Sequence, residues 1–131
     1  DLENVYALAD CCAQTSCSES FCRTAAEASA CGVPVVATEV GGLAAVAVRD
    51  GETGMLVPPS AGHKWNAPLA AADRKRFADA IDGVLRFPEL AGRFGRAGRV
   101  YAVDVLDDRR NTAWHRAVIG ELIDRPRGGA A

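Results

Sequence analysis

Two glutamates frame the stretch ESFCRTAAE, with Glu19 at its first position and Glu27 at its last. A helix that begins between them presents unpaired backbone N–H groups and the positive end of its dipole, which together favour a phosphate group. The amides expected at this helix start are those of Phe21, Cys22, Arg23 and Thr24. The stretch therefore predicts a place where a phosphorylated ligand could bind.

The side chains around this helix start add to the same chemistry. Arg23 brings a positive charge to the phosphate-binding end. Glu27 lies one turn into the helix, where its carboxylate can accept hydrogen bonds from sugar hydroxyls without repelling a phosphate, and Glu19 can do the same on the other side. Spacing alone does not separate this pair from the carboxylates that any solvated helix surface carries.

The elements on either side of the stretch must position it. Residues 10–16 read as a strand, with Cys and Gln where β-branched residues are usual, and residues 21–31 read as an alanine-rich helix. Gly32 follows as a left-handed C-terminal residue, and Pro34 cannot continue the helix. A strand followed by a helix places the loop between them at the sheet edge where open parallel sheets bind ligands.

The rest of the first half completes an α/β pattern. Residues 2–9 have the apolar spacing of an amphipathic helix, and the run PVVAT at 34–38 is wholly apolar, as in a strand buried on both faces. The segments expected beyond it are a turn at Gly41-Gly42, a short helix at 43–48 and a strand at 55–58. This order predicts a parallel sheet of about three strands with right-handed crossovers.

The second half is expected to be helical. A loop over 60–72, rich in Pro, Gly, Ala and Asn, ends where Asp73 caps a helix that Pro88 stops. One apolar stripe on this helix contains Phe77, Ile81, Val84 and Leu85. The remaining predicted segments are helices over about 88–102 and 109–124 and a frayed tail over 125–131.

The composition is that of a globular protein. Of 131 residues 49% are hydrophobic and 24% are charged, and the formal net charge is −2, so no basic surface for nucleic acid is expected. No apolar run approaches the roughly 20 residues of a membrane span, and the first residues lack the basic start of a signal peptide. We expect a cytoplasmic protein without a nucleic-acid partner, and nothing indicates membrane association. The start without Met, inside a predicted helix, suggests a segment of a longer polypeptide.

The five cysteines all lie in the first quarter of the chain, at Cys11, Cys12, Cys17, Cys22 and Cys31. An odd number cannot all pair in disulfides, and cytoplasmic thiols are mostly reduced. Three of them are evenly spaced, but no C-x-x-C pair and no nearby histidine complete a standard metal pattern. We expect small, partly buried thiols, with a metal site as the less favoured alternative.

A longer pattern extends from Ser18 to Pro59. It reads S-E-S-F-C-x-x-A-x-E-A-x-A-C-G-V-P-V-V-A-T-x-V-G-G-L, followed by V-x-D-G-E-T-G-M-L-V-P-P. This pattern resembles the donor-binding half of the family-four retaining glycosyltransferases, whose GT-B fold has two Rossmann-like domains. The resemblance covers roughly the first half of the chain. It implies a partial Rossmann-like parallel sheet, from the C-terminal half of a GT-B enzyme, followed by α-helices.

The resemblance also implies roles for the residues of the opening stretch. In that family the first glutamate of the E-x7-E pattern contacts the donor sugar, the second binds the nucleotide ribose, and the amides between them hold the pyrophosphate. These roles fall on Glu19 as the catalytic residue, on Glu27, and on the segment from Phe21 to Thr24. Members use a nucleotide-sugar such as a UDP- or GDP-sugar as substrate.

The resemblance further implies how the reaction proceeds. Members transfer the sugar with retention and without a metal or other cofactor, and the leaving phosphate helps to deprotonate the acceptor. No general base is therefore sought at His63 or His115. The run V-G-G-L-x-x-V-x-V-x-D-G is also similar to the mycothiol-pathway branch, which moves N-acetylglucosamine to an inositol phosphate. Sucrose-phosphate synthases and many mannosyl- and glucosyltransferases share these sequence motifs, so the nucleotide base, the donor sugar and the acceptor stay open.

The sequence departs from the family pattern at several places. Glycine is usual where this chain has Cys22, because the backbone there approaches the donor closely, and a bulky aliphatic residue is usual at Arg23. The strand before the motif, normally rich in Val, Phe and Leu, reads CCAQTSC. The family's acceptor domain, the first strands of its nucleotide-binding domain and an upstream basic residue are not among these residues. We therefore expect marginal stability and no independent turnover.

Two interpretations follow. In the first, residues 1–131 are the C-terminal nucleotide-sugar-binding domain of a glycosyltransferase, truncated at its N-terminal side, whose partner is the missing N-terminal acceptor domain. In the second, the chain is a degenerate or truncated copy that acts as a non-catalytic nucleotide-binding or interaction module. A generic dinucleotide-binding module is disfavoured because no G-x-G-x-x-G follows a strand. The expected parts are an α/β donor-site core, a loop, a helical region and a tail, over 1–59, 60–72, 73–124 and 125–131.

Overall fold

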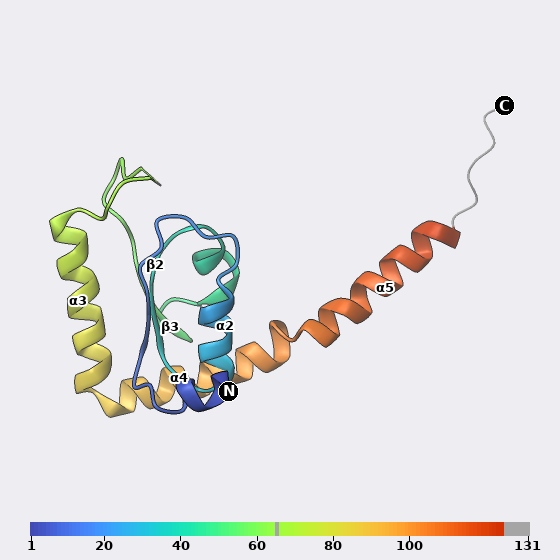
Figure 1. Cartoon of the computed structure of the whole chain (residues 1–131), viewed down its shortest axis with the longest axis horizontal. Helices are drawn as coiled ribbons and strands as arrows, with labels where there is room; N and C mark the ends of the chain where they lie inside the picture. The colour runs from blue at the N-terminus through green and yellow to red at the C-terminus, as the bar shows by residue number, and fades with distance from the viewer. Residues whose placement is uncertain (65, 125–131) are drawn as a thin grey trace.

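The computed structural model describes residues 1–64 and 66–124. Figure 1 shows an α/β body from which one long helix projects. The elements in chain order are α1 (Leu2–Tyr6), β1 (Cys12–Gln14), α2 (Arg23–Ala30), β2 (Val35–Thr38), the π-helical turn η1 (Leu43–Ala47), β3 (Gly54–Val57), α3 (Ala71–Arg86), α4 (Pro88–Val105) and α5 (Asp108–Asp124).

The sheet has three parallel strands in the order β1-β2-β3. Val35 at the start of β2 lies opposite Cys12 of β1 and Gly54 of β3. All four residues of β2 are buried, because this central strand is covered on both faces. The predicted parallel sheet of about three strands, with the apolar run at 34–38 as its centre, is confirmed.

The two faces of the sheet carry separate cores. On one face Val35 and Ala37 pack with Leu43 of η1 and with the buried alanines of α2. On the other face Val36 and Val57 pack with one side of α3 and with Phe94 of α4. Successive residues of β2 thus point to opposite faces, and Figure 1 shows α2 and α3 on opposite sides of the strands.

The helix α2 ends just before Gly32, as the sequence predicted. Gly32 is left-handed, with φ of 79°, and its N–H donates to the carbonyl of Ser29 at 2.9 Å. The next N–H, that of Val33, donates to the carbonyl of Ala28 at 2.9 Å. These two bonds form a Schellman motif, which releases the chain into β2.

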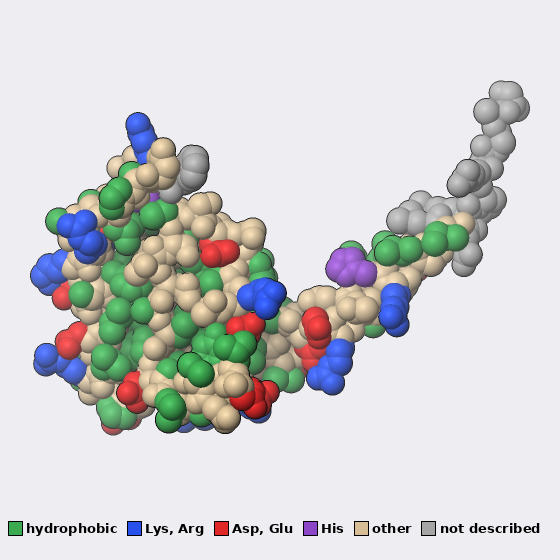
Figure 2. Space-filling view, viewed as in Figure 1, with side chains coloured by type: hydrophobic (Ala, Val, Ile, Leu, Met, Phe, Trp, Pro, Cys, Tyr) green, Lys and Arg blue, Asp and Glu red, His purple; other side chains and the backbone are tan. Residues whose placement is uncertain are grey.

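The helices α4 and α5 close and extend the body. The helix α4 packs against α2 and α3, and Figure 1 shows it along the end of the sheet opposite the loop that joins β1 to α2. The helix α5 then leaves the body as an arm, on which Figure 2 shows hydrophobic side chains. Its exposed hydrophobic residues include Trp114, Ile119 and Ile123. In the described part of the chain no helix combines the length and the apolar character that crossing a membrane requires.

Several predicted details of the first half are wrong. The first helix ends at Tyr6 instead of residue 9, because the chain turns there toward β1, and Leu8 is 87% exposed. The strand predicted over 10–16 is only Cys12–Gln14. The helix predicted over 21–31 is shorter at its start, because Cys22 is left-handed and cannot belong to it.

The second half also needs correction. Asp73 does not cap its helix, since α3 begins at Ala71 after the N-cap Ala70, and the carboxylate bonds elsewhere. Leu85 does not belong to the buried stripe, because it is 53% exposed and does not pack with Phe77 and Val84 in the core. Pro88 does stop α3 and opens α4, which confirms that boundary. The predicted tail over 125–131 lies outside the described residues.

Candidate functional site

The loop that joins β1 to α2 is held by the loop that follows β2. The N–H of Gly42 donates to the carbonyl of Glu19 at 2.7 Å. A Cβ atom on Gly42 would lie 1.8 Å from the carbonyl oxygen of Ser20, so only glycine fits this approach. The hydroxyl of Thr38, at the end of β2, also donates to the carbonyl of Ser16 at 2.5 Å. The V-G-G segment thus serves as a backbone support for the loop that carries the first glutamate.

Cys22 turns the chain from this loop into α2. It is the N-cap of the helix, with φ of 67° and ψ of 79°, and it is buried. Among the described residues it is the one non-glycine residue with a positive φ. Such a conformation costs a residue with a Cβ about 1 to 2 kcal/mol. The backbone therefore has the shape for which glycine is suited, and a cysteine occupies it.

This turn changes which amides begin the helix. Phe21 and Cys22 lie before α2, whose first residues are Arg23 and Thr24. The N–H of Ala26 already bonds to the carbonyl of Cys22, at 3.3 Å. The amides of the first helical turn come from the residues just after Cys22, at the carboxyl edge of the sheet.

Glu27 lies on the first turns of α2 and is held from two sides. The hydroxyl of Tyr6 donates to its Oε2 at 3.1 Å, and a guanidinium nitrogen of Arg23 lies 3.7 Å from its Oε1. Its side chain remains 38% exposed. The carboxylate therefore has acceptor capacity left for a ligand.

Glu19 is fixed less tightly. Its side chain is half-buried, and the hydroxyl of Ser16 lies 3.4 Å from its Oε2. Its backbone carbonyl is used by Gly42, but its carboxylate has weak support from the protein. Like Glu27, it keeps unused acceptor positions.

An open cleft of about 870 Å³ lies beside α2, where α4 passes into α5. Phe21, Arg23 and Glu27 line one wall, whereas Glu19, Cys22 and Thr24 do not line it. The opposite wall contains Asp107, Arg109 and His115, among others. The structure thus brings three of the six predicted site residues to one cleft, and leaves Glu19 on the supported loop beside it.

On the opposite wall the charged residues Asp107 and Arg109 bind each other. The backbone N–H of Arg109 donates to Asp107 Oδ1 at 2.7 Å, and its guanidinium donates to Oδ2 at 3.2 Å, which holds the pKa of the Asp107 carboxyl below its usual value. His115 is placed by a hydrogen bond between Nδ1 and the carbonyl of Asn111 at 2.8 Å. His63, the other histidine, does not line this cleft.

Burial raises the pKa of the thiols in β1 and at the turn before α2. Burial raises the pKa of Cys22, while the amides of Ala25 and Thr24 act against that rise and the charges of both glutamates add to it. Burial also raises the pKa of Cys11 to about 11. All five cysteines are free thiols, and the described residues contain no group of three or more potential metal ligands. Four of the thiols are partly buried as predicted, whereas Cys22 is buried.

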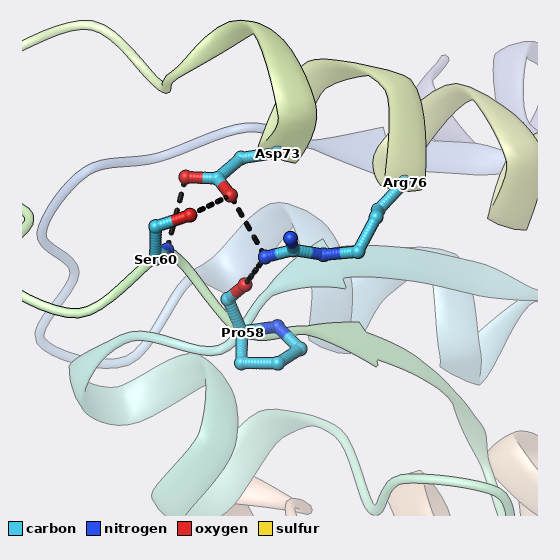
Figure 3. A network of polar contacts seen from close by, with 4 residues as sticks. All are labelled: Pro58, Ser60, Asp73 and Arg76. Carbon is cyan, nitrogen blue, oxygen red and sulfur yellow. Dashed lines mark hydrogen bonds and ion pairs between the residues drawn. The ribbon is translucent and has the colours of Figure 1, made fainter.

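A second carboxylate network lies at the loop between β3 and α3, and Figure 3 shows it from close by. Asp73, which is 1% exposed, accepts bonds from the backbone N–H of Ser60 at 3.0 Å and from its hydroxyl at 2.5 Å. Arg76 donates to the same carboxylate at 2.8 Å and to the carbonyl of Pro58 at 2.7 Å. The bonds from Ser60 lower the pKa of Asp73 most. The protein's own donors therefore occupy the Asp73 carboxylate, which leaves it nothing to offer a ligand.

The sequence comparisons assign the family. Residues 1–86 match the family described as glycosyl transferases group 1. This chain belongs to that family. It is similar to the D-inositol 3-phosphate glycosyltransferase of Mycobacterium avium strain 104, at 40% identity over the whole chain and 29% of that protein. It is also similar to the enzyme of the same name from Mycobacterium tuberculosis strain F11, at 49% identity over 73% of the chain and 17% of that protein.

Solved structures agree with the sequence comparison. This group 1 glycosyltransferase chain superimposes on sucrose-phosphate synthase of Thermosynechococcus elongatus with a TM-score of 0.72 and 30% identity, over 93% of the chain and 27% of the synthase. Anabaena Alr3699/HepE, solved in complex with UDP-glucose, has the same TM-score at 24% identity, over 89% of the chain and 29% of its own length, and shows the fold. The predicted family and the partial GT-B fold are confirmed. The chain spans less than a third of the length of these relatives.

One residue of the site was missed in the sequence. Tyr6 was predicted only as part of an apolar helix face, but its hydroxyl reaches the carboxylate of Glu27. The two residues are 21 positions apart, and no local pattern connects them. The presence of a polar group on an otherwise apolar helical face was the available signal.

Proposed function

We propose that this chain is the donor-binding part of a glycosyltransferase that transfers a sugar from a nucleotide-sugar to an acceptor with retention. The observation that carries the proposal is the placement of two under-bonded glutamates around the start of α2, at the carboxyl edge of a parallel sheet. Membership of the group 1 glycosyltransferases supports it. Solved relatives that hold UDP and UDP-glucose favour a uridine nucleotide as the probe.

The proposed contacts follow the chemistry of each group. The pyrophosphate lies at the left-handed turn and the first amides of α2, with the segment Phe21–Thr24 around it and Arg23 supplying a positive charge. Glu27 accepts hydrogen bonds from the ribose hydroxyls, and Glu19 contacts the donor sugar as the catalytic residue. Backbone amides and one arginine neutralise the phosphate in this proposal, so it assigns no metal and no other cofactor.

The transfer itself is proposed for a longer chain. This chain supplies the donor side, and an acceptor-binding domain that precedes it supplies the other wall. The leaving phosphate accepts the proton of the acceptor hydroxyl as the glycosidic bond to the nucleotide breaks and the new bond forms on the same face of the sugar. Neither His63 nor His115 is assigned a part in this step. The protein is proposed to act in the cytoplasm, where nucleotide-sugars are available.

Titration calorimetry with UDP tests the nucleotide part of the proposal. We expect Glu27→Ala to weaken UDP binding about tenfold or more, because a hydrogen bond to a charged group is worth about 1.5 to 3 kcal/mol. The matched control is Glu52→Ala, since Glu52 also forms one exposed pair with an arginine, Arg49, at 3.6 Å, but lies outside the cleft. Equal effects of the two substitutions would contradict the role of Glu27.

A second titration tests the role of Glu19. We expect Glu19→Ala to weaken binding of UDP-glucose several-fold and to leave binding of UDP unchanged, because only the sugar reaches this carboxylate. Circular dichroism confirms that each variant is folded. If the folded, unsubstituted chain gives no heat with UDP or GDP, the non-catalytic interaction module becomes the better interpretation.

A further inference from the structure

Tyr6 connects two parts of the molecule that are distant in sequence. It is the last residue of α1, and its hydroxyl lies over the first turns of α2, 3.1 Å from Oε2 of Glu27 and 3.4 Å from the carbonyl oxygen of Thr24. The aromatic ring packs against the core on the α2 face of the sheet, as Cys12 and Cys31 do. The hydroxyl is therefore carried by a half-buried ring that the core supports on one side.

The hydroxyl proton goes to the carboxylate. A phenol has one hydrogen to donate, and a charged acceptor binds it more strongly than a neutral carbonyl at a longer distance. The pKa of Tyr6 is raised to about 12, by burial first and by its hydrogen bond to Glu27 second. The phenol therefore remains a donor throughout the neutral range and never becomes a competing anion.

The other contact to Glu27 cannot fix the side chain in the same way. Arg23 approaches Oε1 at only 3.7 Å, and its own side chain is 85% exposed. Such an exposed pair within one helix is worth a few tenths of a kcal/mol and is screened by salt. Tyr6 is thus the contact that limits the rotamers of Glu27.

We propose that Tyr6 is a positioning residue for nucleotide binding: its hydroxyl occupies one acceptor position of Glu27 and orients the remaining ones toward the ribose hydroxyls. This inference rests on the proposed function, because it needs Glu27 as the ribose ligand. A carboxylate has about four acceptor positions, so one bond to Tyr6 leaves enough for two hydroxyls. Restricting the rotamer beforehand removes an entropy cost from binding.

The experiment compares two tyrosine substitutions and two nucleotides. Tyr6→Phe removes only the hydroxyl, and Tyr101→Phe is the matched control, because the Tyr101 hydroxyl donates at 2.8 Å to the carbonyl of Val46, away from the cleft. Both variants and the unsubstituted chain are titrated with UDP and with its 2′,3′-dideoxy analogue, which lacks the hydroxyls that Glu27 would bind. Circular dichroism and thermal melting check folding.

We expect Tyr6→Phe to weaken UDP binding about fivefold, the effect of roughly one hydrogen bond. Binding of the dideoxy analogue should be unchanged in Tyr6→Phe, and Tyr101→Phe should bind both nucleotides like the unsubstituted chain. A general structural role of Tyr6 would instead weaken both nucleotides equally, and that result overturns the inference. In a Glu27→Ala background, which leaves Tyr6 no side-chain acceptor at position 27, Tyr6→Phe should have no further effect on UDP binding.

The outcomes separate this inference from the function beneath it. If Glu27→Ala weakens UDP binding and Tyr6→Phe does not, the ribose contact stands and the role of Tyr6 is wrong. If the unsubstituted chain is folded and binds no UDP, the proposed function fails and the role of Tyr6 fails with it.

Discussion

Two loops leave the carboxyl edge of the same parallel sheet, and they differ in how far the protein hydrogen-bonds their carboxylates. After β3, the carboxylate of Asp73 is buried and accepts bonds from Ser60 and Arg76 within its own loop and helix. After β1, Glu19 and Glu27 are partly exposed and each has one close hydroxyl donor from the protein. The first arrangement fixes a connection, and the second leaves acceptors for a ligand.

The difference teaches how to separate a structural acid from a binding acid. A buried carboxylate is tolerable only if the protein satisfies its oxygens, and once it is satisfied it has nothing to offer a ligand. The β1 loop must therefore obtain its rigidity from elsewhere, and it does so from the backbone of Gly41 and Gly42. The close backbone contacts of the two glycines hold the loop in place, and the carboxylates of the two glutamates remain available to a ligand.

The largest expected effect comes from breaking that external support. In Gly42→Ala the new Cβ would meet the carbonyl oxygen of Ser20 at 1.8 Å, and neither backbone can move without displacing the loop. We expect a loss of about 3 kcal/mol or more in the free energy of unfolding, together with loss of UDP binding. Urea unfolding followed by circular dichroism measures the loss.

The control for this prediction is Gly83→Ala, because Gly83 lies within α3 and a Cβ there would meet nothing within 4 Å. This substitution should stabilise the chain by about 0.5 to 1 kcal/mol, since alanine favours a helix. A Gly42→Ala variant as stable as the unsubstituted chain would show that the two loops are independent.

The next effect comes from breaking the satisfied network after β3. Asp73→Ala leaves the donors of Ser60 and Arg76 without their acceptor, so we expect the melting temperature to fall by about 5 to 10 °C while UDP binding to the folded fraction is unchanged. Asp79→Ala is the control, because that acid is exposed and pairs only with Lys75. If Asp73→Ala is fully folded at the temperature of the titration and still does not bind UDP, Asp73 belongs to the binding site.

The same network predicts a pH dependence. The pKa of Asp73 is lowered by its bonds to Ser60, so the ionised form stabilises the fold. That contribution is complete above the unfolded value near pH 4 and is lost as the pH falls through the lower folded value. The difference in melting temperature between the unsubstituted chain and Asp73→Asn should therefore be largest near neutral pH and should shrink below about pH 4.

These two loops also show what the sequence could predict. The central strand and the end of α2 followed from an apolar run and from Gly32 with Pro34, which are local signals. The E-x7-E pair was found by its pattern, although its roles remain proposals. The bond from Tyr6 to Glu27 and the burial of Asp73 depend on partners 21 and 13 residues away, so no local propensity contains them.

A smaller effect tests the left-handed turn between the two glutamates. Cys22→Ala keeps the strained φ and removes a buried sulfur, whereas Cys22→Gly relieves the strain and also removes the side chain. We expect the glycine variant to be about 1 kcal/mol more stable than the alanine variant, because the left-handed cost exceeds the entropy cost of glycine. Chemical unfolding of both variants measures this difference. Equal stabilities would mean that the turn relaxes around the cysteine.

The smallest effect on stability is expected at Arg23, on the exposed side of the helix start. Its pair with Glu27 is long and exposed, so Arg23→Leu should change the free energy of unfolding by less than about 0.5 kcal/mol. Its effect on binding should be larger and should depend on salt, because a guanidinium near a diphosphate acts through charge. We expect UDP to bind a few-fold more weakly to Arg23→Leu at low ionic strength, with the difference vanishing at high ionic strength. If the difference persists in high salt, Arg23 does not act through its charge. It would then act by orienting the side chain of Glu27, which is the role proposed for Tyr6.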